Sequence, residues 1–134
     1  MWKFFINGNS ISSNSNTVKE KETFSNGTYK HGNTKVTFKD NKFNLYLDEN
    51  YSLDGLYEIK DNQTIVCNIT DYTFNAPDGA RKHDISQNEK WIISFNIKDE
   101  KTLEVKDINL PDQEIEIIIS IHNLIGKENK FLLQ

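Results

Sequence analysis

The sequence lacks an excess of positive charge. Its 16 Lys and Arg residues are outnumbered by 20 Asp and Glu residues, which gives a formal net charge of −4 at pH 7. Acidic and basic residues are interspersed, so neither half of the chain is strongly polarised. Because binding to nucleic acid depends largely on neutralising phosphates with Lys and Arg, we expect no nucleic-acid partner.

Cysteine and long apolar runs are also scarce. The single cysteine, Cys67, excludes an internal disulfide, and its neighbours Val66 and Ile69 predict a small buried hydrophobic residue rather than a reactive thiol. No run approaches the roughly 18–20 apolar residues of a membrane span. The apolar run 2–6 is too short for a signal-peptide core, although it could form a first strand. The localisation is unknown: the cytoplasm, or export after removal of a leader.

Motifs for catalysis and for cofactor binding are missing as well. His31, His83 and His122 show none of the spacings that metal sites use. There is no Gly-x-Ser-x-Gly motif, no glycine-rich phosphate loop and no dinucleotide fingerprint. We therefore predict a protein that is not an enzyme, with no catalytic residues, no metal and no cofactor. His83 and Asp84 would be the pair to inspect in an enzyme.

The chain is, by contrast, rich in aromatic residues, which make up 11% of it. Together with Ile and Thr, they favour a sheet with one solvated face. At 134 residues the chain should form a single domain over residues 1–134. Residues 7–22, rich in Ser and Asn, predict a loop-like N-terminal segment. The abundance of Asn, Lys and Ile is typical of AT-rich bacterial or phage genomes.

One pattern occurs twice between residues 27 and 74. A Gly-x-Tyr sequence at 27–29 opens the first copy and another at 55–57 opens the second, and each leads through a polar turn into an alternating strand. The turns at 39–42 and 60–63 share their Lys-Asp-Asn chemistry. Consecutive antiparallel strands joined by tight turns are predicted, with a bulge or bend at Gly55.

Alternation continues toward the C-terminus with one interruption. Residues 75–87 predict a long loop, after which alternation resumes at Trp91. Residues 114–121 predict a strand with four isoleucines on the core side and two glutamates on the solvent side, and residues 130–133 predict a closing strand. The sum is nine or ten short strands with no amphipathic helix. We predict an all-β, antiparallel up-and-down meander that closes into a small β-barrel, with a two-sheet β-sandwich as the alternative.

The residues that carry these turns and strands resemble small bacterial lipocalin-like proteins over about residues 23–106. The resemblance lies in the two Gly-x-Tyr sequences, in residues 36–43 and in residues 64–66. It implies a calycin-type, lipocalin-like barrel, often exported or membrane-anchored in bacteria, whose interior holds an apolar ligand.

The first functional hypothesis is a binding protein that holds a small apolar molecule. Aromatic side chains on the predicted strands are its candidate ligand-binding residues: Phe43, Tyr57, Tyr72, Phe74, Trp91 and Phe95.

The second hypothesis is a small protein-interaction module or inhibitor, phage- or plasmid-encoded, that acts through its surface or through residues 75–90. Long loops on rigid β scaffolds often carry function. Arg81, Lys82 and His83 are the candidate interaction residues in this loop. A solvated hairpin closed by cross-strand aromatic residues is the structural alternative for the same segment.

Overall fold

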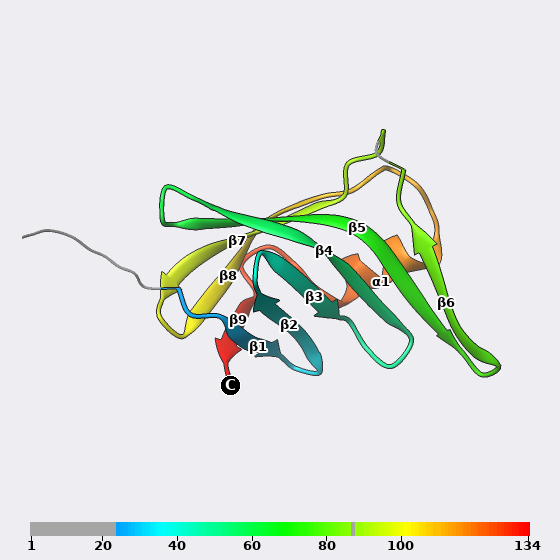
Figure 1. The fold of residues 1–134 in the computed structure, drawn as a ribbon, viewed down its shortest axis with the longest axis horizontal. Coiled ribbons are helices and arrows are strands. Elements are labelled where there is room, and N and C mark those ends of the chain that lie inside the picture. Colours follow the sequence, from blue (N-terminus) through cyan, green and yellow to red (C-terminus); the bar gives the residue numbers. More distant parts are fainter. Residues whose placement is uncertain (1–23, 87) are drawn as a thin grey trace, which may run out of the picture.

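The computed structural model describes residues 24–86 and 88–134. In this part of the chain the protein is all-β with one short helix (Figure 1). The elements in chain order are β1 (Gly27–His31), β2 (Thr34–Lys39), β3 (Lys42–Tyr46), β4 (Tyr51–Lys60), β5 (Thr64–Ala76), β6 (Gly79–Asp84), β7 (Ile92–Asp99), β8 (Thr102–Asn109), α1 (Glu116–Leu124) and β9 (Lys130–Leu133). The predicted strand at 2–6 and the loop-like segment 7–22 lie outside the described residues.

Eight of the strands form a closed antiparallel barrel. Strands β1 to β5 pair as successive hairpins, β5 pairs with β7, β7 with β8 and β8 with β9, and β9 pairs with β1 to close the ring. The prediction of an antiparallel barrel is therefore confirmed over the alternative sandwich. Strand β6 lies outside the ring and pairs with β5 alone among the described strands.

The strand register turns the alternation of the sequence into an apolar interior. One row runs through Tyr29, Val36, Leu45 and Leu53, which are direct cross-strand partners and are all buried. Because successive side chains point to opposite faces of a strand, the residues before and after each of these four point to the outside of the barrel. The predicted turns are confirmed, since Asp40 and Asn41 adopt the positive φ values, 53° and 68°, that tight hairpin turns require.

The predicted irregularity at Gly55 is also confirmed. The pairing of β4 with β5 shifts between Asp54 and Gly55, so that Thr70 on β5 is the additional residue of a bulge. A Cβ atom at position 55 would lie 1.9 Å from the backbone oxygen of Asn68. Only glycine allows the two backbones to approach this closely.

The predicted strand over residues 114–121 is wrong, because residues 116–124 form the helix α1. Isoleucine also occurs at the helical spacing there: Ile117, Ile118 and Ile121 are buried, and Ile125 follows at the C-cap. A helix buries these four against the barrel and leaves Ile119 46% exposed. The expectation that the chain has no amphipathic helix is wrong for the same reason.

The predicted loop over residues 75–87 is wrong for residues 75–76 and 79–84, which belong to strands. Strand β5 continues to Ala76, and β6 returns along it from Gly79 to Asp84. All six residues of β6 are exposed, so no apolar alternation marks this strand in the sequence. Figure 1 shows that the β5–β6 hairpin projects from the same end of the barrel as α1 (orange).

The described core is continuous from the barrel interior to the buried face of α1. Cys67 lies in this core at 1% exposure, and burial raises the pKa of its thiol. The prediction of a buried cysteine is therefore confirmed, and the raised pKa disfavours the reactive thiolate.

Candidate functional site

The six predicted ligand-binding residues do not form one site. Phe43 and Phe95 are buried in the barrel interior at 3% and 1% exposure, and Phe95 packs edge-on against Phe38 and Phe131 at centroid distances of 6.3 and 5.6 Å. Tyr57 packs edge-on against Phe38 at 5.0 Å, and its hydroxyl donates to Oδ1 of Asn26. These three rings pack against other core side chains.

The other three, Tyr72, Phe74 and Trp91, lie near α1, where a pocket of about 150 Å³ opens between the helix and the barrel. We call it the aromatic pocket. Its lining residues are Tyr51, Tyr72, Phe74, His83, Ile115, Glu116 and Ile117.

The strand register explains why four rings converge in the aromatic pocket. Tyr51 on β4 is paired with Phe74 on β5, and Tyr72 on β5 is paired with His83 on β6. Tyr72 is also paired with the buried Leu53, which places Tyr72 and His83 on the inner face of the sheet. The ring centroids are 5.3 Å apart for Tyr51 and Phe74 and 5.1 Å apart for the stacked Tyr72 and His83. Three neighbouring strands therefore present aromatic side chains toward the start of α1.

Trp91 supports this group of rings without lining the pocket. Its ring stacks on Tyr72 at a centroid distance of 5.9 Å, and its indole Nε1 donates to Oε1 of Glu89 at 3.0 Å. Trp91 is 3% exposed, so it holds Tyr72 in place from inside the barrel.

Glu116 brings a carboxylate to the aromatic pocket. The Tyr51 hydroxyl donates to its Oε1 at 2.8 Å. Burial, and next the hydrogen bond to Glu116, raise the pKa of Tyr51 to about 12, which keeps this tyrosine neutral near pH 7. Glu116 also lies in the first turn of α1, where a negative charge is favourable. The hydrogen bond therefore joins the barrel wall to the beginning of the helix.

Of the three predicted interaction residues, the structure brings only His83 into the aromatic pocket. The Arg81 guanidinium pairs with Asp78 at 2.7 Å, and Lys82 Nζ lies 4.0 Å from Asp84. Both pairs are exposed, and such pairs contribute little to stability.

Comparison with protein-family models, with curated proteins and with solved structures finds no match to this chain.

Sequence reasoning missed Tyr51, Ile115, Glu116 and Ile117 as lining residues of the aromatic pocket. The sequence predicts Glu116 on the solvent side of a strand, whereas the structure has a helix there, and this helix brings Glu116 to Tyr51. The signal for Tyr51 was present in the sequence, because it begins the alternating row that includes Leu53 and Gly55.

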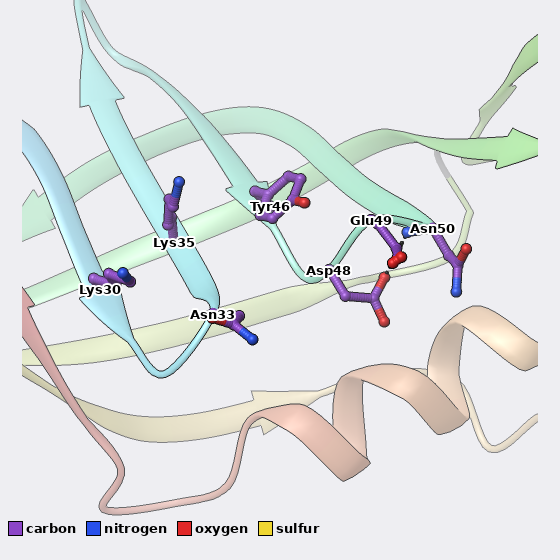
Figure 2. Close-up of a pocket in the computed structure, with 7 residues that line it drawn as sticks. All are labelled: Lys30, Asn33, Lys35, Tyr46, Asp48, Glu49 and Asn50. Atoms are coloured by element: carbon purple, nitrogen blue, oxygen red, sulfur yellow. Dashed lines mark hydrogen bonds between the residues drawn. The ribbon is translucent and has the colours of Figure 1, made fainter.

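A larger depression of about 420 Å³ lies on the outer surface of the barrel (Figure 2). Lys30, Lys35 and Tyr46 project from β1, β2 and β3, and residues 48–50 line it from the β3–β4 turn. Asp48 already accepts hydrogen bonds from the backbone N–H groups of Asn50 and Tyr51, and Lys35 Nζ lies 5.6 Å from the Tyr46 ring centroid. These polar groups serve the turn and one another, so the aromatic pocket is the stronger candidate site.

Within residues 24–86 and 88–134, no group of three or more His, Cys, Asp or Glu side chains could hold a metal ion. In the same part of the chain, no helix is long and apolar enough to cross a membrane.

Proposed function

We propose that this protein is a non-catalytic, lipocalin-like binding protein that takes a small apolar group into the aromatic pocket. The observation that carries the proposal is the convergence of Tyr51, Tyr72, Phe74 and His83 from three adjacent strands beside the start of α1. Binding sites for small molecules are concave and mostly apolar, with a few placed polar groups. The aromatic pocket has this composition.

The position at the end of the barrel follows from how the interior is filled. Inner-facing side chains at the middle of the strands, such as Val36, Leu45 and Leu53, are at most 1% exposed. In barrels of about eight strands, side chains can fill the whole interior. The rings of the aromatic pocket are more accessible, since Tyr72 and Phe74 are only partly buried and His83 is exposed.

The polar groups of the aromatic pocket support binding rather than catalysis. A nucleophile mechanism needs an activated side chain with a paired base, whereas the lining residues contain no Ser, Thr, Cys or Lys. The Tyr51 hydroxyl is held neutral and already donates to Glu116.

The test is an NMR titration of the ¹⁵N- and ¹³C-labelled full chain with 3,3-dimethyl-1-butanol, a small neutral apolar probe. We expect saturable chemical-shift changes at Tyr72, His83 and Ile117. The Tyr72→Ala variant should bind the probe at least several-fold more weakly. Tyr46→Ala on the outer face of β3 is the matched control and should leave binding unchanged. Shift changes centred on Phe43 and Phe95 would instead place the ligand in the barrel interior, and an absence of saturable shifts would reject small-ligand binding here.

The exposed strand β6 favours a second candidate function, a protein-interaction module. Among the described strands β6 has one partner, and each of its residues is exposed. Such an edge can accept an added strand from another chain. Sedimentation at increasing concentration distinguishes the homotypic form of this hypothesis, because a stable dimer supports it and a monomer throughout the range counts against it.

A further inference from the structure

The geometry points to an organic cation as the ligand of the aromatic pocket, specifically a methyl-substituted ammonium group. This inference rests on the proposed function and adds the chemical class of the ligand. Aromatic rings carry negative charge on their faces and attract a cation placed within about 6 Å of the ring centroid. Tyr51, Phe74 and His83 surround one small volume, and Tyr72, whose two faces stack on His83 and Trp91, closes it with its ring edge.

The charges of the lining residues favour a cation over an anion. Glu116 brings a full negative charge, and no Lys or Arg lines the pocket. The beginning of α1 opposes it with a partial positive charge of roughly half a unit. The sum of the Glu116 charge and this partial charge is therefore negative. The Tyr51 hydroxyl donates to Oε1 of Glu116, which holds this carboxylate at the pocket.

The polar groups of the pocket also favour a methylated ammonium over a bare one. A bare ammonium has three N–H donors that need acceptors when it leaves water. The acceptors at the pocket are the Glu116 carboxylate, the two tyrosine hydroxyls and the His83 ring, and the Tyr51 hydroxyl already occupies one carboxylate oxygen. A quaternary ammonium has no donors, so it can leave water for an aromatic surface without an unsatisfied hydrogen bond.

The size of the pocket limits how much of the ligand it encloses. Pockets for drug-sized molecules are about 300–1,000 Å³, whereas the aromatic pocket is about 150 Å³. It therefore accepts a head group, and the remainder of a larger ligand lies outside. Ile115, which lines the pocket at the N-cap of α1, is 37% exposed. Ile119, one helical turn further along the chain, is 46% exposed, so the two offer an apolar surface to the rest of the ligand.

The test uses three probes of nearly the same shape on the full chain: choline, its neutral carbon analogue 3,3-dimethyl-1-butanol, and the anion 3,3-dimethylbutanoate. We expect choline to bind about ten-fold more tightly than the neutral analogue at pH 7, which corresponds to about 1.4 kcal/mol. The anion should bind most weakly. The preference for choline should decrease with added salt, because Glu116 is exposed to solvent.

Variants separate the charge of Glu116 from its structural role. Glu116→Gln keeps an acceptor for the Tyr51 hydroxyl and should lower the affinity for choline several-fold more than the affinity for the neutral analogue. Glu114→Gln makes the same change two residues away, at an exposed position that does not line the pocket, and should change neither affinity. The comparison of the three probes on the unmodified protein needs no variant, so it stands even if Glu116→Gln alters the fold.

The outcomes distinguish a failure of the cation inference from a failure of the proposed function. Equal binding of choline and the neutral analogue in the aromatic pocket overturns the cation inference and leaves the proposed function intact. Tightest binding of the anion also overturns the inference. If none of the three probes binds, both the inference and the proposed function are overturned.

Discussion

At the scale of single residues, Tyr51 connects the barrel to the helix. Its ring packs against Phe74 inside the sheet, and its hydroxyl donates to Glu116 on α1, 65 positions along the chain. A hydrogen bond to a charged acceptor contributes about 1.5–3 kcal/mol to stability. The same contact shapes one wall of the aromatic pocket, so stability and the candidate site depend on one side chain.

We predict that Tyr51→Phe is less stable than the unmodified protein near pH 8 and that this difference shrinks in alkali. The pKa of Tyr51 is raised from 10.0 to about 12, so the folded state retains a proton that the unfolded state loses in this range. The stabilisation is fully present below about pH 10 and is lost as pH rises toward 12, by about 2 kcal/mol. Urea unfolding of both proteins from pH 8 to 11.5 measures it. Tyr46→Phe, on the outer face, should show no such narrowing, and a constant difference for Tyr51→Phe would contradict the assignment.

At the scale of elements, the barrel strands could be predicted from the sequence, whereas strand β6 and the helix could not. Barrel strands such as Thr34–Lys39 bury alternate residues, here Thr34, Val36 and Phe38, so their period is visible in the sequence. In α1, isoleucine at both odd and even positions satisfies a strand period and a helical period together. Only the contact with the barrel selects the helix, and this contact brings Glu116 to Tyr51.

The candidate site shows the same division. Tyr72 and Phe74 could be singled out as aromatic residues of a predicted strand, and His83 as a residue of the segment where the alternation stops. Their convergence could not be predicted, because it requires β6 to return along β5. A strand with six exposed residues leaves no period in the sequence.

We predict that the two faces of α1 differ strongly in their tolerance of truncation. Ile121→Ala should lower the free energy of unfolding by about 3 kcal/mol, since Ile121 is fully buried and its loss leaves a cavity. Ile119→Ala makes the same change at a 46% exposed position of the same helix and should stay within about 0.5 kcal/mol. Urea unfolding measures both, and equal losses would mean that α1 does not pack on the barrel by the face described.

At the scale of the whole molecule, the barrel depends on its shortest strand. Strand β9 has four residues, yet it pairs with β8 on one side and β1 on the other. Phe131, at its centre, is fully buried and packs against Phe95. A ring that opens here exposes two sheet edges at once, and such edges favour aggregation.

We predict that Phe131→Ala lowers the free energy of unfolding by about 3–5 kcal/mol. The neighbouring Leu132 points outward and is 53% exposed, so Leu132→Ala should change stability by less than about 1 kcal/mol. Thermal unfolding combined with light scattering records both the loss of stability and the aggregation expected of an open ring. Similar behaviour of the two variants would show that β9 is dispensable for closure.

The position of β6 outside the ring has a consequence for how such a protein can diversify. The number of strands and the tilt of a barrel are linked by closure, so an insertion within a ring strand disturbs the whole molecule. Strand β6 takes no part in closure, yet it supplies His83 to the aromatic pocket. Changes in β6 can therefore alter the lining of the aromatic pocket while the barrel stays unchanged.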